Sequence, residues 1–176
     1  MQLDKIKIIA FDEIDSTNDY LINNYQKLQS YTIVKTNFQT KGRGQFKRGW
    51  FSNKGENLLF SILLKDILIK QIDLIKNIVK ESLIKLLEQY NIKGIFKEPN
   101  DILVNSKKIL GILIETKTKN HEEFDYIVIG IGININQKEF NDLNATSFYN
   151  ITNKKYNNNE ILQEFIKIFC NKLRQL

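Results

Sequence analysis

Residues 41–50 carry the densest set of groups that could bind an anion. They read Lys-Gly-Arg-Gly-Gln-Phe-Lys-Arg-Gly-Trp. Glycine lets backbone N–H groups approach an oxyanion closely, and the arginine guanidinium forms paired hydrogen bonds with phosphate. The segment lacks the Gly-Lys-Ser/Thr of a Walker loop and the third glycine of the dinucleotide fingerprint. We interpret it as a phosphate-binding loop of another kind; the alternatives are a solvated hairpin tip and an Arg-Gly RNA-binding loop that stacks bases on Phe46 and Trp50.

Two further segments combine polar residues or glycines with a strand-like sequence. Lys-Glu-Pro-Asn-Asp at residues 97–101 precedes a tight turn at residues 105–106, and residues 107–115 follow it. Polar residues at the mouth of such a hairpin can converge on a ligand, and Gly111 within a strand indicates close approach by another group. Gly130 and Gly132 interrupt an apolar run in the same way. An ordinary turn and tight packing are the alternatives to a ligand site.

The residues needed for nucleophilic or zinc chemistry are scarce. His121 is the one histidine and Cys170 the one cysteine. A zinc cluster, a disulfide and a Ser-His-Asp or Cys-His arrangement are therefore not expected. The chemistry must depend on cations rather than on a histidine base. The net charge of +6 is compatible with nucleic acid, an anionic small molecule or compositional bias alone, so the charge does not select a partner.

Hydrophobic periodicity predicts the elements that position these segments. Strands are expected at residues 5–11, 31–38, 57–64, 94–97, 102–104, 109–116 and 126–134. Helices are expected at residues 72–87 and 160–173 and directly after Ser16, which forms a capping-box pattern with Asp19. Residues 39–56 are predicted to be a long basic loop and residues 150–159 a surface connection. Short connections imply antiparallel pairing, so we predict the α+β class: a mixed, largely antiparallel sheet with helices packed on one side.

Length and composition indicate one compact domain. The chain has 176 residues, of which 42% are hydrophobic, near the average for a single globular domain. No stretch approaches the roughly 18 apolar residues of a membrane span, and the N-terminus lacks the cleavage site of a signal peptide. A cytoplasmic protein with no membrane partner is therefore expected.

Taken in order, these segments resemble the catalytic domain of biotin protein ligases. The resemblance covers about residues 11–148 and rests on seven short motifs in the family's order: Asp15-Ser16-Thr17-Asn18, Gln39-Thr40-Lys41-Gly42-Arg43-Gly44, Trp50-Phe51-Ser52 with Gly55 and Asn57-Leu58, Lys97-x-Pro99-Asn100-Asp101, Lys108-Ile109-x-Gly111-Ile112-Leu113-Ile114-Glu115, Gly130-Ile131-Gly132-Ile133-Asn134 and Ala145-Thr146-Ser147.

The resemblance implies the class II synthetase-like fold of these ligases. It implies a single catalytic domain over residues 1–176, with neither an N-terminal DNA-binding domain nor a C-terminal β domain. ATP with Mg²⁺ would activate biotin to biotinyl-5′-AMP, and the biotin would pass to a lysine of the biotin carboxyl carrier protein of a carboxylase. No DNA partner is expected, and an oligomer is compatible with the sequence.

Two alternative functions stay open at this point. Lipoate-type protein ligases share the fold and the adenylating chemistry, although the Gly-Arg-Gly loop and the Lys108-Ile109-x-Gly111 segment favour biotin. A basic nucleic-acid-binding module, with the glycine-rich loop as its contact, belongs to a different class of protein.

The resemblance also assigns roles to individual residues. Arg43 and Lys108 would be catalytic, holding the biotin carboxylate and the α-phosphate. Biotin binding is assigned to Ser16, Thr17, Asn18, Gln39, Arg43, Gly44, Gln45, Lys108 and Gly111. ATP binding is assigned to Arg43, Arg48, Trp50, Asn100, Asp101 and Asn134, with Asp101 also expected at the metal. The chain departs from the family pattern at Gln45 and Lys47, where an arginine and a glycine are usual, and at Glu98, where an aromatic residue is usual.

Overall fold

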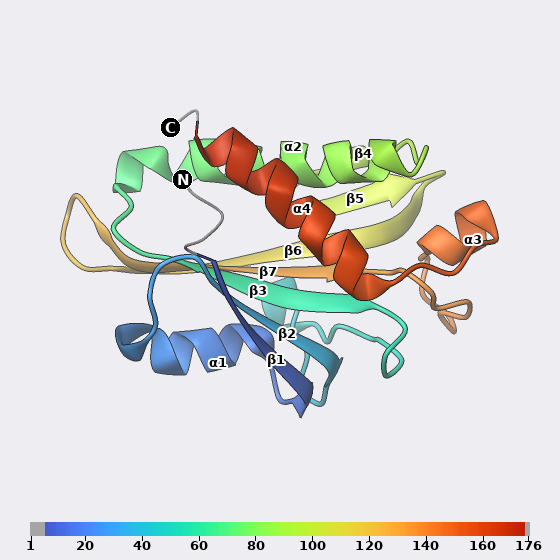
Figure 1. Ribbon diagram of the computed structural model, residues 1–176, viewed down its shortest axis with the longest axis horizontal. Coiled ribbons are helices and arrows are strands. Elements are labelled where there is room, and N and C mark those ends of the chain that lie inside the picture. The colour runs from blue at the N-terminus through green and yellow to red at the C-terminus, as the bar shows by residue number, and fades with distance from the viewer. Residues whose placement is uncertain (1–5, 175–176) are drawn as a thin grey trace.

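The computed structural model describes residues 6–174 and is built around one seven-stranded sheet (Figure 1). The order across the sheet is β1-β2-β3-β7-β6-β5-β4. The strands are β1 (Lys7–Ile14), β2 (Thr32–Gln39), β3 (Leu58–Leu64), β4 (Ile95–Lys97), β5 (Asp101–Val104), β6 (Lys107–Thr118) and β7 (Phe124–Ile133). β1 and β2 pair in parallel, and the other neighbouring strands pair antiparallel. The predicted α+β class with a mixed, largely antiparallel sheet is confirmed.

Helices cover both faces of this sheet. α2 (Ile72–Gln89) and α4 (Asn158–Leu173) lie on one face, and α1 (Thr17–Asn24) lies on the other (Figure 1). The prediction that the helices pack on one side is therefore wrong for α1. The reason lies in β3, which is buried at every position. Phe60 packs against Phe165 of α4, while Leu63 belongs with Leu21 of α1 to a second apolar cluster. A strand that is apolar throughout needs cover on both faces.

Several element boundaries differ from the prediction. β1 continues to Ile14, and Lys5, which was expected in this strand, lies outside the described residues. α3 (Phe148–Thr152) occupies part of the predicted surface connection, because Ser147 caps it and Phe148 is fully buried. Single helical turns follow α1 and precede α2, at η2 (Tyr25–Lys27) and η4 (Ile69–Gln71). Within the described chain, no helix combines the length and the apolar character needed to cross a membrane.

The basic loop has a defined backbone path. The Trp50 N–H donates to the Gly42 carbonyl at 2.9 Å, and the Gly44 N–H donates to the Arg48 carbonyl at 2.7 Å. The tip is a single turn, η3 (Gln45–Lys47), where Phe46 has a left-handed φ of 56°. These bonds fold the loop back on itself, so that both of its ends return to the sheet.

The register of the central strands places three glycines on the face that α1 covers. Gly111 lies opposite Gly132, and Gly130 lies opposite both Ser61 and Leu113. Because glycine has no side chain, the sheet is hollowed at this point, next to the start of α1.

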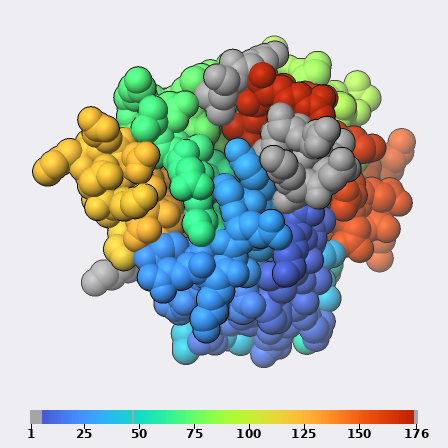
Figure 2. Space-filling model, turned by 60° about the vertical axis from the view of Figure 1, so that its left-hand side comes forward, coloured from blue at the N-terminus to red at the C-terminus, as the bar shows by residue number. Residues whose placement is uncertain are grey.

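At their connecting turn, β6 and β7 are hydrogen-bonded to the segment that precedes α2. Their connecting turn projects from the surface beside the segment that leads into α2 (Figure 2). The Ile69 N–H donates to the Glu122 carbonyl at 2.8 Å, and the Phe124 N–H donates to the Ile67 carbonyl at 3.0 Å. These bonds anchor the two longest strands at the end remote from the glycines.

Candidate active site

A pocket lies over the three glycines, between the start of α1, the basic loop and β6. The residues predicted to bind biotin or ATP that line it are Ser16, Thr17, Asn18, Gln39, Arg43, Gly44, Trp50, Asn100, Lys108 and Gly111. They come from segments far apart in the sequence, so it is the fold that brings them together.

The indole of Trp50 fills one end of this pocket. A Cβ added to Gly132 would lie 2.6 Å from the indole, and one added to Gly111 would lie 2.9 Å from it. This packing therefore requires glycine at both positions. The remaining cavity is about 40 Å³, which has room for water but not for a metabolite. A metabolite therefore needs more room than this cavity has, and the indole of Trp50 is the group that fills it.

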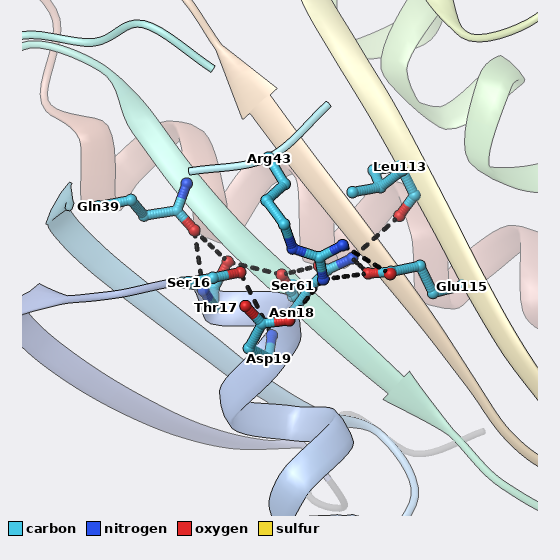
Figure 3. Close-up of polar contacts among 9 residues, drawn as sticks. All are labelled: Ser16, Thr17, Asn18, Asp19, Gln39, Arg43, Ser61, Leu113 and Glu115. Carbon is cyan, nitrogen blue, oxygen red and sulfur yellow. Dashed lines mark hydrogen bonds and ion pairs between the residues drawn. The ribbon is translucent and has the colours of Figure 1, made fainter. Parts of the chain in front are cut away.

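One wall of the pocket is a chain of hydrogen bonds among polar side chains (Figure 3). The Thr17 backbone N–H donates to Gln39 Oε1 at 2.8 Å, and Thr17 Oγ1 lies 3.0 Å from the same oxygen. Thr17 Oγ1 is also 2.7 Å from Ser61 Oγ, which donates to Asn18 Oδ1. Asn18 Nδ2 donates to Glu115 Oε2 at 2.7 Å. Thr17, Asn18 and Ser61 are buried, so the wall presents hydrogen-bonding groups in fixed directions.

The start of α1 follows from its capping residue. The Ser16 side chain accepts the Asp19 N–H at 3.3 Å, as the capping pattern predicts. The Asp19 carboxylate contacts Arg43. The cap thus places Thr17 and Asn18 in the wall and an acidic side chain at the edge of the pocket.

Arg43 reaches from the loop into the pocket, where two carboxylates hold it (Figure 3). Its Nη1 and Nη2 each donate to a Glu115 oxygen at 2.9 Å, and Nη2 also donates to Asp19. These bonds, first to Glu115 and then to Asp19, raise the pKa of Arg43 above its ordinary value. Its Nε is buried and has no partner among the described residues, which leaves one donor for a ligand.

Lys108 occupies the end of the pocket near Trp50. Its Nζ lies 2.7 Å from Asp101 Oδ1 and 5.2 Å from the centre of the Trp50 ring. Asn134 Nδ2 donates to the carbonyls of Lys108 and Thr146 at 3.3 and 3.0 Å. Asn134 Oδ1 and Trp50 Nε1 are buried without a partner in the described chain. Unpaired buried polar atoms beside a pocket indicate groups kept for a ligand.

Four predicted residues do not line the pocket. Asp101 and Asn134 both contact Lys108, and Lys108 itself lines the pocket. Gln45 lines two neighbouring cavities instead, and Arg48 is exposed at the surface of the loop.

Three residues of the site were not assigned a binding role from the sequence: Asp19, Ser61 and Glu115. Ser61 had a usable signal, because it is the one polar residue in the apolar run Leu58–Leu64. Glu115 follows Gly111 by four residues in a strand, and that even spacing places both on one face. The position of Asp19 beside Arg43 depends on the path of the loop, for which the sequence held no pattern.

Asp101 is the candidate metal ligand. Over residues 6–174 no group of three or more His, Cys, Asp or Glu side chains is arranged to hold a metal ion. Mg²⁺ that accompanies a nucleotide is commonly bound by one or two carboxylates, waters and the phosphates. A single carboxylate beside Lys108 fits that requirement.

Comparison with known proteins identifies the family of ligases to which this fold and pocket belong. The profile of the Biotin/lipoate A/B protein ligase family matches residues 10–134. The chain therefore belongs to this family, and the match includes each predicted site residue.

Two relatives are bifunctional ligase/repressor proteins. The chain is 31% identical over 151 residues to the bifunctional ligase/repressor BirA of Bacillus subtilis, covering 81% of this chain and 46% of that protein. It is 33% identical over 141 residues to BirA of Escherichia coli, covering 76% of this chain and 42% of that protein. The chain thus spans less than half the length of these relatives.

A solved structure shows the same fold. The biotin protein ligase from Aquifex aeolicus, in complex with biotin and ATP, superposes with a TM-score of 0.78 at 31% sequence identity. The superposition covers 96% of this chain and 71% of that one.

Proposed function

We propose that this chain catalyses the ATP-dependent activation of biotin to biotinyl-5′-AMP and the transfer of biotin to a lysine of a biotin carboxyl carrier protein. The observation that carries the proposal is one pocket in which a neutral hydrogen-bonding wall meets two cations, Arg43 and Lys108, above a floor of glycines. Biotin has the matching chemistry, with a ureido head at one end and a carboxylate at the other.

The wall suits the ureido head. That group has one carbonyl acceptor and two N–H donors, and the side chains of Ser16, Thr17, Asn18 and Gln39 line the pocket as hydroxyl and amide groups. Buried polar groups of this kind penalise a ligand that leaves them unpaired. The dithiolane ring of lipoate has no hydrogen-bonding groups to offer, so the wall favours biotin over lipoate.

In the first reaction step, a carboxylate oxygen of biotin forms a bond to the α-phosphorus of ATP and pyrophosphate leaves. Arg43 and Lys108 orient the two anions and stabilise the charge that develops on the phosphoryl oxygens. Trp50 covers the adenine, and Asn134 Oδ1 is free to accept its amino group. Mg²⁺ bound with the nucleotide would neutralise phosphate charge, and Asp101 is the carboxylate that would hold it.

In the second step, the neutral amine of the acceptor lysine attacks the carbonyl of the mixed anhydride. The amide bond forms, AMP leaves with the electron pair of the broken C–O bond, and the proton lost from the amine nitrogen passes to solvent. Arg43 and Lys108 again face the departing phosphate. The protein's contribution to both steps is orientation and fixed positive charge.

The test is to supply the protein with ATP, Mg²⁺ and biotin and to measure pyrophosphate release. Mass spectrometry then locates biotin on a carboxylase carrier domain, with a carrier whose target lysine is replaced by arginine as the control. We expect release that depends on biotin and modification that depends on the lysine. Product with lipoate and none with biotin would contradict the proposal in favour of a lipoate ligase.

A further inference from the structure

Glu115 has contacts that extend beyond an ordinary ion pair. It lies on β6, on the same face as Gly111, and 27% of its side chain is exposed. One of its oxygens accepts from Arg43 alone, and the other accepts from both Arg43 and Asn18. A carboxylate is therefore shared between the cationic end of the pocket and its neutral wall (Figure 3).

The contact with Asn18 sets the orientation of the amide. An ionised carboxylate can only accept hydrogen bonds, so Asn18 must present Nδ2 to Glu115. Its Oδ1 then points to Ser61, whose hydroxyl donates to it. The single hydroxyl proton of Ser61 is donated to Asn18 Oδ1. In the 2.7 Å contact between Ser61 and Thr17, the Thr17 hydroxyl is therefore the donor.

Thr17 in turn contacts Gln39, the last residue of the hydrogen-bonded wall. The Thr17 hydroxyl proton serves both the Ser61 contact at 2.7 Å and Gln39 Oε1 at 3.0 Å, and the Thr17 backbone N–H donates to the same Gln39 oxygen at 2.8 Å. The Gln39 Nε2 donors are then left for the pocket. Glu115 is thus the nearer of two acceptors that orient Asn18, the other being the Leu113 carbonyl at 3.4 Å, and through Asn18 it sets the direction of the Ser61 and Thr17 hydroxyls.

We propose that Glu115 is a positioning residue that determines the specificity of the pocket for a ureido head, by orienting Asn18 and through it the hydroxyls of Ser61 and Thr17. The inference rests on the proposed function, because the ligand in question is biotin. Glu115 is not a catalytic residue, since it acts through other side chains.

Glu115→Gln tests this directly. The substitution keeps the shape and replaces one acceptor oxygen with an NH₂ donor, which must face a donor of Arg43 or Asn18. We expect the Kd of biotin, measured by calorimetry without ATP, to rise by about tenfold to a hundredfold, the range for one hydrogen bond to a charged group. Glu115→Asp keeps a carboxylate acceptor and should recover part of the affinity.

A second ligand distinguishes a loss of specificity for the ureido head from a general loss of ligand binding. A straight-chain carboxylic acid as long as biotin has the carboxylate and no ureido group. We expect Glu115→Gln to weaken biotin more than it weakens this acid, so that the ratio of the two affinities falls. Equal weakening of both ligands would overturn the proposal and leave Glu115 as a support for Arg43 only.

Asp125→Asn is the matched control. Asp125 lies on the neighbouring strand β7, is 28% exposed, and is paired with Lys117 and Tyr25 instead of with the pocket. Its substitution removes the same kind of ion pair and should leave biotin binding unchanged. Unchanged or tighter biotin binding in Glu115→Gln would overturn the proposal. Absence of biotin binding by the unsubstituted protein would instead contradict the proposed function.

Discussion

At the scale of single residues, Arg43 and Lys108 face the pocket with carboxylate partners already in place. Glu115 lies 2.9 Å from Arg43, and Asp101 lies 2.7 Å from Lys108. Both cations nevertheless keep donors in reserve, because an ammonium has three N–H groups and Nε of Arg43 is unpaired within the described chain. A ligand anion can therefore add to each cation without breaking the existing pair.

Replacing Lys108 by alanine should lower the rate of biotin adenylation by ~10²–10³, the scale for removing one preorganised transition-state donor. Arg43→Ala should have an effect of the same order. The measurement is single-turnover formation of biotinyl-5′-AMP. Lys117→Ala, on the same strand but in an ion pair with Asp125, should retain the full rate.

Thermal melting distinguishes a chemical role from a structural one. Lys108 and Arg43 are 33% and 35% exposed, and partly exposed ion pairs contribute up to about 1 kcal/mol to stability. The two variants should therefore stay folded at the assay temperature. Loss of activity that merely follows loss of folded protein would assign them a structural role.

The motif residues were predictable because each lies in a short segment with a chemical pattern of its own. Glycine beside arginine indicated the loop, and Lys-x-Pro-Asn-Asp and Gly-x-Gly indicated the hairpin and the neighbouring strand. The partners of these residues were harder to predict. Ser61 meets Asn18 because α1 packs against β3, and Glu115 meets Arg43 because the loop returns over β6. No local pattern determines either contact.

At the scale of elements, the same reasoning explains which features were predicted and which were not. The strands were predictable from their apolar runs, since a buried strand needs little else. The face of the sheet on which α1 packs was not predictable from the sequence, because α1 is short and β3 is apolar on both faces. The backbone path of the loop also escaped prediction, since it depends on the bonds of Gly42 and Gly44.

The loop should close over the bound adenylate. Trp50 and Arg43 leave a cavity of about 40 Å³, so the loop must open to admit the ligand, whose phosphate can then hold it shut. We expect trypsin to cut the free protein within residues 41–55 and to cut it more slowly with biotin and ATP present. Peptide mapping over time measures both rates.

The turn between β6 and β7 gives an internal reference for this experiment. Lys119 in that turn is exposed and lies at the end of the strands remote from the glycines. Cleavage there should be the same with and without ligand. Equal protection at both sites would point to general stabilisation and contradict closure of the loop.

At the scale of the whole molecule, the pocket brings together side chains from segments that are far apart in the sequence. Ser16–Asn18 precede and begin α1, Gln39 ends β2, and Arg43 belongs to the loop, whereas Lys108 and Gly132 belong to β6 and β7. These segments sit on the face opposite the larger apolar cluster under α2 and α4. A ligand in the pocket therefore adds contacts between elements that the main core does not connect on that face.

Bound adenylate should consequently stabilise the whole fold. A ligand that binds only the native state at about 100 times its Kd adds roughly 2.7 kcal/mol, and for a chain of this size each kcal/mol raises the Tm by roughly 2–4 °C. Preformed biotinyl-5′-AMP at that concentration should therefore raise the Tm by ~5–10 °C, read by calorimetry. Lipoyl-5′-AMP at the same concentration keeps the adenylate and lacks the ureido head, so it should give a smaller rise, because it offers no acceptor to the Gln39 Nε2 donors that face the pocket. An equal rise with the two adenylates would mean that the wall does not recognise the head group, and no rise with either would mean that the adenylate binds elsewhere or not at all.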